Sequence, residues 1–293
     1  MTRESLRVTL LSAVRRLEDA GVPSARVDAE ELAAHVLGVP RTRLGLTPLV
    51  DGEFVERYDA LVQRRAQRIP LQHILGEASL GSITVEVGPG VFIPRPETEL
   101  LVDWAVRAIA DVTRPVVVDL CTGTAAIALA IAAVRPDATV YGVERDPSAL
   151  AWARRNVDRH AQAGRTNVRL RGGDFTDPRL LADLDGTTDL VTANPPYVPD
   201  DTPVEPEVAD HDPSVAVFGG ADGLDVIRPL VNVAAGLLKP GGLLAIEHDD
   251  TQGESVPALL RSRRVLTDVE DHQDLTGRPR FVTATRVRLT GQS

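Results

Sequence analysis

The residues with the clearest chemical implication follow one another in the chain: Asn194, Pro195, Pro196 and Tyr197. The amide oxygen of Asn194 can accept a hydrogen bond, and the two prolines offer carbonyl oxygens but no N–H groups. Tyr197 adds a flat aromatic surface. Such a group suits a planar –NH2, which is a poor nucleophile and must be oriented toward an electrophilic methyl group. The motif therefore predicts alkylation of an amino or amide nitrogen, and by itself it does not separate adenine from glutamine.

This motif ends an apolar run, "TDLVTA", within a region where apolar strands alternate with helical patterns. The expected strands are "PVVVDL", "ATVYGVE", "NVRLRGGD", "TDLVTAN" and "GGLLAIEH", and the expected helices cover 125–134, 147–160 and 224–238. This alternation predicts an α/β fold whose parallel sheet is covered on both faces. The segment "RRVLTDVEDHQDLTGRPRFVTATRVRL" adds two strands, which we expect to form a hairpin at the sheet edge.

Polar side chains stand at the ends of these strands, where open α/β sheets bind ligands. The loop after the first strand contains Gly123 and small neighbours, which let backbone approach a ligand. Glu144 ends the second strand and could accept both hydroxyls of a ribose. Asp174 and Phe175 end the third and suit an adenine amino group and ring. Together they predict an adenosine-containing cofactor. The loop, Cys-Thr-Gly-Thr-Ala-Ala, has one of the three glycines of a dinucleotide fingerprint, which disfavours NAD.

The first part of the chain has helical periodicity. Leu6, Leu10, Val14 and Leu17 share one helix face, a second helix follows Ser24, and a third runs from about Gly52 to Gln67. These helices predict a small bundle. From Ser79 the pattern alternates in "SITVEVGPGVFIP", which predicts a β-hairpin that turns at Gly88-Pro89-Gly90.

Composition limits the classes of partner. The chain has 293 residues, 43 % of them hydrophobic, and a net charge of -10, whereas a general nucleic-acid binder usually has a basic surplus. The single cysteine, Cys121, excludes an internal disulfide and a cysteine-cluster zinc site. His248 has no second histidine at ligand spacing, so no metal site is expected. No apolar run approaches a membrane span and no secretory signal is visible, so we expect a cytoplasmic protein.

The position of "NPPY" resembles the amino-group branch of the S-adenosylmethionine-dependent methyltransferases. In order, "IPLQHILG", "FIPRPETELLVDWA", "VVVDLCTGTAAIALAIA", "NPPYVP", "FGGADGLDVIRPL" and "LLKPGGLLAIEH" resemble the release factor glutamine methyltransferase (HemK/PrmC-type) family over nearly the whole chain. The resemblance implies a seven-stranded Rossmann-like methyltransferase sheet with an N-terminal helical bundle. It divides the chain into a helical substrate-recognition domain (1–75), a linking β-hairpin (76–95) and a methyltransferase domain (96–293).

The same resemblance implies that S-adenosyl-L-methionine methylates N5 of the glutamine in the Gly-Gly-Gln motif of class-I peptide chain release factors. Asn194 and the Pro195 carbonyl would hold the glutamine amide, with Pro196 and Tyr197 completing the catalytic motif. The implied cofactor-binding residues are Arg95, Pro96, Thr98, Asp119, Cys121, Thr122, Gly123, Thr124, Ala125, Glu144, Asp174, Phe175 and Asn194. Among these, Arg95, Pro96 and Thr98 would line the methionine end. No direct contact with nucleic acid or membrane is implied.

Several alternatives remain open at this point. Ala125 stands where the family usually has glycine, and if the position needs a positive φ, alanine costs about 1 kcal/mol. Its methyl group could also weaken cofactor binding, so a chain without cofactor activity is one alternative. Others are methylation of a glutamine in a ribosomal protein and of adenine N6 in nucleic acid, which the acidic charge disfavours. Arg95 could form a structural salt bridge. The acidic segment 200–212 could be a solvated loop or a lid within 198–222.

Overall fold

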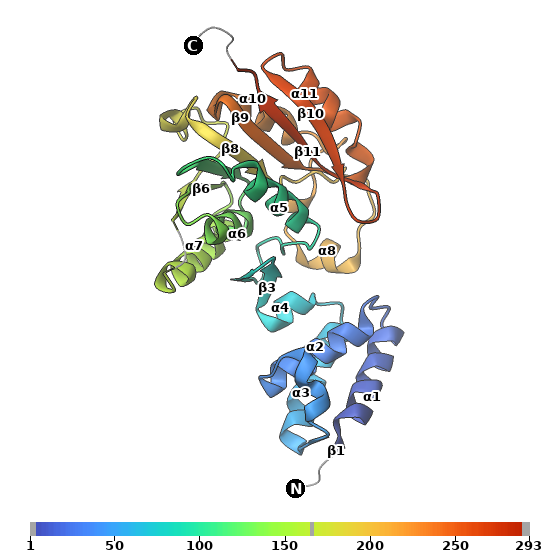
Figure 1. The fold of residues 1–293 in the computed structure, drawn as a ribbon. Helices are drawn as coiled ribbons and strands as arrows, with labels where there is room; N and C mark the ends of the chain where they lie inside the picture. Colours follow the sequence, from blue (N-terminus) through green and yellow to red (C-terminus); the bar gives the residue numbers. More distant parts are fainter. Residues whose placement is uncertain (1–3, 165–166, 289–293) are drawn as a thin grey trace. The chain divides into compact units, whose positions relative to one another are not determined.

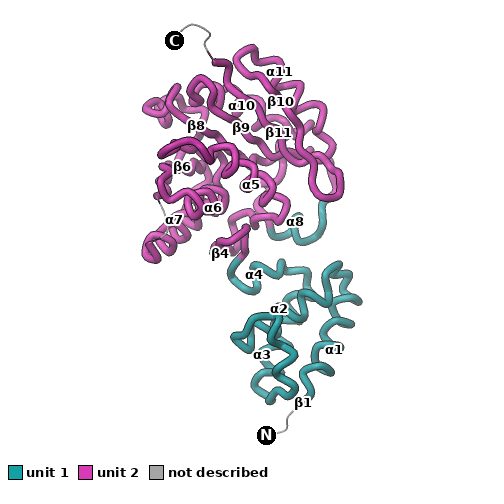
Figure 2. The backbone as a smooth tube through the Cα atoms, in the orientation of Figure 1, with its two compact units in different colours: residues 1–77, 204–211 teal, residues 78–203, 212–293 magenta. Residues whose placement is uncertain are grey.

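The computed structural model describes residues 4–164 and 167–288, which form two compact units. The first unit holds the chain up to Glu77 together with Val204–His211, and the second holds the remainder (Figure 2). The chain therefore leaves the second unit after Pro203 and returns to it at Asp212. No local pattern in the sequence indicated that this later segment belongs with the N-terminal helices.

The first unit is the predicted helical bundle (Figure 1). Its elements are β1 (Glu4–Ser5), α1 (Leu6–Asp19), α2 (Ala25–Leu37), the 3-10 helix η1 (Arg41–Leu46), β2 (Leu49–Val50), α3 (Gly52–Ala66), α4 (Leu71–Leu75) and α8 (Pro206–His211). Leu17, Leu32 and Tyr58 are buried between the three long helices, and for Leu17 the helical spacing predicted this. Asp51 begins α3 by accepting the Phe54 N–H at 2.9 Å.

A β-hairpin begins the second unit, but its predicted turn was wrong. The strands are β3 (Glu77–Leu80) and β4 (Ile83–Glu86), and the chain reverses at Gly81, which has a φ of 57°. Gly88 serves packing instead, because a Cβ there would lie 2.6 Å from the ring of Trp152. The two glycines thus lie after the hairpin: Gly88 permits close packing, and Gly90 takes a φ of 91° in a turn that follows β4.

The second unit is built on the predicted sheet, with seven strands among the described residues. The parallel strands are β5 (Val116–Leu120), β6 (Thr139–Glu144), β7 (Val168–Gly172), β8 (Thr188–Ala193) and β9 (Leu238–Glu247). The antiparallel strands β10 (Leu266–Gln273) and β11 (Pro279–Arg286) complete the order β10-β11-β9-β8-β5-β6-β7, so the predicted edge hairpin is confirmed. The chain reverses its direction across the sheet between β5 and β8, which makes the carboxyl ends of these strands the expected ligand site.

Helices cover both faces of this sheet (Figure 1). On one face lie α5 (Thr98–Ala108), α6 (Ala126–Val134) and α7 (Pro147–Gln162), and on the other lie α10 (Ile227–Leu237) and α11 (Ser255–Arg261). Adjacent strand residues alternate between the two cores: Val117 packs with the first group and Val118 with the second. The short elements η2 (Ala182–Leu184), α9 (Ser214–Val217) and η3 (Asp250–Gln252) lie in the connections. Among the described helices, none has the length and apolar character needed to cross a bilayer.

Candidate active site

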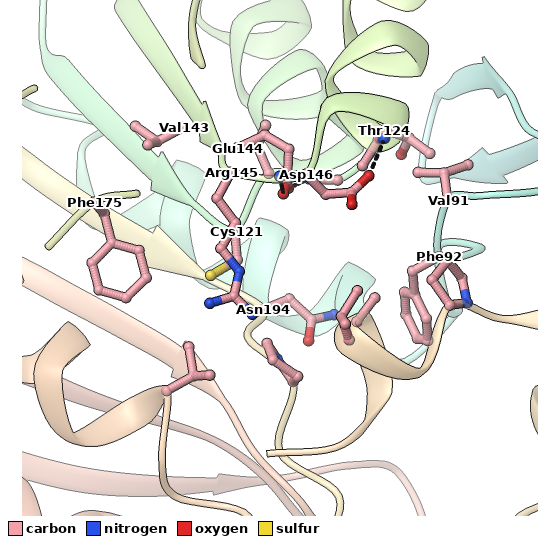
Figure 3. Close-up of a pocket in the computed structure, with 18 of the residues that line it drawn as sticks. Val91, Phe92, Cys121, Thr124, Val143, Glu144, Arg145, Asp146, Phe175 and Asn194 are labelled. Atoms are coloured by element: carbon pink, nitrogen blue, oxygen red, sulfur yellow. Dashed lines mark hydrogen bonds between the residues drawn. The ribbon is translucent and has the colours of Figure 1, made fainter. Parts of the chain in front are cut away.

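The carboxyl ends of β5, β6, β7 and β8 open onto one cavity of about 310 Å³ (Figure 3). In this view Phe175 lies at one end, Phe92 at the other and Asn194 between them. The predicted site residues that line the cavity are Thr98, Cys121, Thr122, Gly123, Thr124, Glu144, Asp174, Phe175, Asn194 and Pro196. Those that do not line it are Arg95, Pro96, Asp119, Ala125, Pro195 and Tyr197. The strand-end residues of the sequence argument are thus brought to one place.

Asp119 lies beneath the loop that follows β5. It is fully buried and accepts hydrogen bonds from the hydroxyl groups of Thr122 at 2.5 Å and Thr192 at 2.9 Å. Burial raises the pKa of Asp119 to about 7. These contacts connect the loop with both β5 and β8, so Asp119 holds the loop in place.

The loop itself has a left-handed backbone at three positions. Cys121, Gly123 and Ala125 have φ values of 59°, 56° and 64°. Position 125 therefore does need a positive φ, and alanine there costs about 1 kcal/mol or more. The Ala125 side chain is fully buried in the apolar core under α5–α7. The departure from the family thus strains the backbone without occupying cofactor space. Burial also raises the pKa of the Cys121 thiol well above its usual range, which disfavours a nucleophilic role.

Glu144 connects the loop with the end of β6. Its two carboxylate oxygens accept the backbone N–H groups of Gly123 and Asp146, each at 2.9 Å. Burial, which leaves the residue 9 % exposed, raises its pKa. A carboxylate has about four acceptor positions. These bonds use only part of that capacity, so acceptor positions remain for the hydroxyl groups of a ribose.

Asp174 and Phe175 form the next part of the cavity wall. Asp174 Oδ1 accepts the backbone N–H of Thr176 at 2.9 Å and its hydroxyl at 2.7 Å, and these bonds lower the pKa of Asp174. The residue is therefore ionised at neutral pH and can accept from an adenine amino group. Phe175 is buried and offers an apolar surface beside it.

The side chains of the Asn-Pro-Pro-Tyr motif are held by a carboxyl group that the sequence argument did not assign. Glu247, the last residue of β9, is 3 % exposed and accepts the Thr98 hydroxyl at 2.8 Å and the Tyr197 hydroxyl at 3.1 Å. Asn194 Nδ2 donates to Thr98 Oγ1 at 3.4 Å. The sequence offered one indication that Glu247 belongs to the site: it ends β9, the strand next to β8.

The motif backbone rests on two glycines of the "FGGADG" segment. A Cβ at Gly219 would lie 2.7 Å from the carbonyl oxygen of Pro196, and one at Gly223 would lie 2.1 Å from that of Tyr197. Gln252 Nε2 also donates to the Tyr197 carbonyl at 3.0 Å. Only glycine permits this approach, which explains why the segment is needed to shape the motif.

Three of the six acidic residues in the segment 200–212 form ion pairs: Glu205, Glu207 and Asp212. Arg95 contacts Asp212 at 2.5 Å and stacks on the Phe92 ring. Within the first unit, Glu207 accepts from Arg65 at 2.8 Å and Arg68 at 2.5 Å. Although burial opposes ionisation, these hydrogen bonds lower the pKa of Glu207 to about 2. Arginines thus hold the segment at its middle and at Asp212, its last residue.

The cavity fits S-adenosylmethionine better than a dinucleotide. Four acidic residues line it, Glu144, Asp146, Asp174 and Asp225, together with one arginine, Arg145. Such a wall repels a pyrophosphate but accommodates a cofactor that has a sulfonium and an ammonium group and no phosphate. The residues present therefore match a ribose, an adenine and a cationic chain.

Comparisons with known proteins agree with this geometry. Residues 9–76 match the family model described as the PrmC N-terminal domain, and residues 114–277 match a methyltransferase domain. The chain is 52 % identical over 287 residues to the release factor glutamine methyltransferase of Mycolicibacterium smegmatis, covering 98 % of this chain and 99 % of the relative. Identity to the enzyme of the same name from Mycobacterium tuberculosis H37Rv is 48 %, covering 96 % and 92 %.

A solved structure supports the fold alone. The crystal structure of a methyltransferase from Pyrococcus furiosus superposes with a TM-score of 0.50 at 20 % identity. The match covers 72 % of this chain and 92 % of that one.

Proposed function

The chain belongs to the release factor glutamine methyltransferase family, and from this premise we propose that it methylates N5 of the glutamine in the Gly-Gly-Gln motif of class-I peptide chain release factors. It is an S-adenosylmethionine-dependent methyltransferase. The observation that carries the proposal is the position of Asn194 at the end of β8, on the same cavity as Glu144, Asp174 and Phe175. Asn194 thus places an acceptor for a planar –NH2 group next to the acceptors that suit the cofactor.

The protein's own groups act mainly by orientation. Glu144, Asp174 and Phe175 would hold S-adenosylmethionine, which would supply an electrophilic methyl group to the amide nitrogen while the electron pair of the broken bond stays on sulfur. Asn194 Oδ1 and the Pro195 carbonyl would accept the two amide hydrogens, which aligns the nitrogen and favours its electron donation. The alkylated nitrogen becomes acidic and releases one proton to water. Tyr197 is no base here, because burial beside Glu247 raises its pKa well above the usual value.

The other cofactor assignments have different support. Glu144 would hold the ribose hydroxyls, and Asp174 with Phe175 the adenine, as their free acceptors and exposure to the cavity suggest. The ion pair of Arg95 with Asp212 favours a structural role for Arg95. The methionine end of the cofactor would then lie against Thr98 and the loop after β5. Residues 1–75, which contain nearly all of the match to the PrmC N-terminal domain at residues 9–76, would recognise the release factor. No contact with nucleic acid or membrane is part of the proposal.

Methyl transfer to three acceptors tests the proposal. The purified chain is incubated with S-adenosylmethionine labelled in the methyl group and with a class-I release factor, ribosomal proteins or DNA. A release factor whose Gly-Gly-Gln glutamine is replaced by alanine is the matched control. We expect label on the intact factor and none on the control. Label on DNA or ribosomal proteins, with none on the release factor, would refute the proposal.

A further inference from the structure

Glu247 is a buried carboxyl group beside the cavity that has no role in the proposed mechanism so far. Among the described residues it forms no ion pair, and it accepts hydrogen bonds from the hydroxyl groups of Thr98 and Tyr197. Burying a carboxylate is costly unless its acceptors are used. Both oxygens of Glu247 are used by side chains that belong to, or contact, the Asn-Pro-Pro-Tyr motif.

The direction of these hydrogen bonds decides which way the Asn194 amide faces. An ionised Glu247 can only accept, so the single hydroxyl hydrogen of Thr98 points toward it. The Thr98 oxygen can then only accept from Asn194. Since Nδ2 is the donor end of that amide, it faces Thr98, and Oδ1 is directed away from it. The 3.4 Å distance from Nδ2 to Oγ1 is long, as such contacts often are before a substrate binds.

We propose that Glu247 is a positioning residue that acts through Thr98 to keep the acceptor oxygen of Asn194 turned toward the substrate amide. The role rests on the proposed function, because it assumes that Asn194 accepts a hydrogen bond from a planar –NH2. If Glu247 is neutral, the Thr98 hydroxyl is free to donate to Asn194 Oδ1. The asparagine can then turn, and its own –NH2 would oppose that of the substrate.

The Glu247 carboxylate also accepts a hydrogen bond from Tyr197. Its hydroxyl donates to Oε1 of Glu247, while that of Thr98 donates to Oε2. A glutamine at position 247 has one oxygen and one –NH2, so it can accept from only one of the two hydroxyl groups. Glu247→Gln therefore preserves volume and disrupts the hydrogen-bond pattern, which makes it the informative variant.

The arrangement also implies a pH dependence. Burial raises the pKa of Glu247 to about 7, opposed by the two hydroxyl donors. The charged groups that face it are Glu97, before α5, which raises the pKa, and Arg280 of β11, which lowers it. Asp274 pairs with this arginine at 2.9 Å. Activity should then rise as pH increases through about 7, where Glu247 loses its proton. Because Asp119 has a similar pKa, the pH profile is informative only as a comparison between variants.

The kinetic test uses Glu247→Gln, Thr98→Val and the conservative control Thr98→Ser. We expect Glu247→Gln and Thr98→Val to lower kcat by about 10²-fold, as loss of one oriented polar contact does in other active sites. Their combination should lose little more than either alone, and Thr98→Ser should retain activity. S-adenosylmethionine affinity by calorimetry should stay within about threefold in Glu247→Gln, because Glu247 does not line the cavity. A full kcat in either variant, or a loss in Glu247→Gln that is explained by cofactor affinity, overturns the role.

A second measurement does not depend on catalysis. The side-chain amide signals of Asn194 in ¹⁵N NMR, assigned with Asn194→Ala, should shift with pH near 7 in the wild type but not in Glu247→Gln. If the wild type methylates release factor and these signals are insensitive to Glu247, the positioning role fails. If the wild type methylates none and the signals still follow Glu247, the proposed function fails while the hydrogen-bond relay stands. Thr98→Val keeps the test decisive should Glu247→Gln not fold.

Discussion

Replacing Glu207 by glutamine should destabilise the helical unit by about 3 kcal/mol. Glu207 is 15 % exposed and receives hydrogen bonds from Arg65 at 2.8 Å and Arg68 at 2.5 Å. Its pKa falls from the ordinary 4.5 to about 2 in the folded chain. A shift of one unit corresponds to about 1.4 kcal/mol, so the ionised form contributes about 3 kcal/mol near neutral pH. Glutamine keeps the shape and removes this contribution.

The same pKa shift determines the pH range over which Glu207 stabilises the folded chain. Because the folded pKa is depressed, the stabilisation is fully present above about 4.5 and is lost as pH falls from there through about 2. Near pH 3 less than half of it, about 1.4 kcal/mol, should remain. The assay is urea unfolding followed by far-ultraviolet circular dichroism at pH 7 and pH 3, comparing the variant with the wild type.

Glu205 provides the matched control on the same segment. It contacts Arg68 at 3.4 Å and is 71 % exposed, so Glu205→Gln should cost less than about 1 kcal/mol. Equal effects of the two substitutions at pH 7 would refute the reasoning, as would a Glu207→Gln effect that stays constant between pH 7 and pH 3. In the expected case, limited proteolysis should also cleave the segment 204–211 faster in Glu207→Gln than in Glu205→Gln.

Three further predictions concern the cavity. Asn194→Ala should abolish methyl transfer to release factor while calorimetry finds cofactor affinity within a few-fold of the wild type; retained turnover would contradict its role as substrate acceptor. Glu144→Ala should weaken cofactor binding by about 10- to 100-fold, because two ribose hydroxyls lose their acceptor and a hydrogen bond to a charged group is worth about 1.5–3 kcal/mol; unchanged affinity would remove the ribose assignment. Gly223→Ala should lower both kcat and thermal stability, since its Cβ would lie 2.1 Å from the Tyr197 carbonyl oxygen, and an unchanged kcat would separate that glycine from the motif.

The sequence predicted the cavity because of how parallel strands are arranged. Once four apolar strands are recognised, their carboxyl ends must share an edge, so Glu144, Asp174 and Asn194 are expected together without any distance information. Glycine was less informative where its role was packing rather than turning. Gly88 is small because Trp152 lies against it, and a pattern over a few residues cannot distinguish this from a hairpin turn.

Contacts between distant parts of the sequence could not be predicted in this way. Glu207 pairs with Arg65, 142 residues earlier, and an acidic, proline-containing segment looks the same whether it is solvated or paired. Glu247 was missed for a related reason. Its role depends on Thr98, 149 residues away, and on the direction of hydroxyl hydrogen bonds, neither of which leaves a local pattern.

The departure at Ala125 gains a physical explanation from the same structure. A left-handed alanine costs about 1–2 kcal/mol in the backbone, but burying its methyl group returns about 0.8 kcal/mol, and alanine orders less chain entropy on folding than glycine does. These contributions nearly cancel, so a glycine is not required for stability at this position. The methyl group lies in the core rather than on the cavity wall. Because Glu144 and Asp174 keep their acceptors turned to the cofactor side, Ala125 gives no reason to expect a chain without cofactor binding.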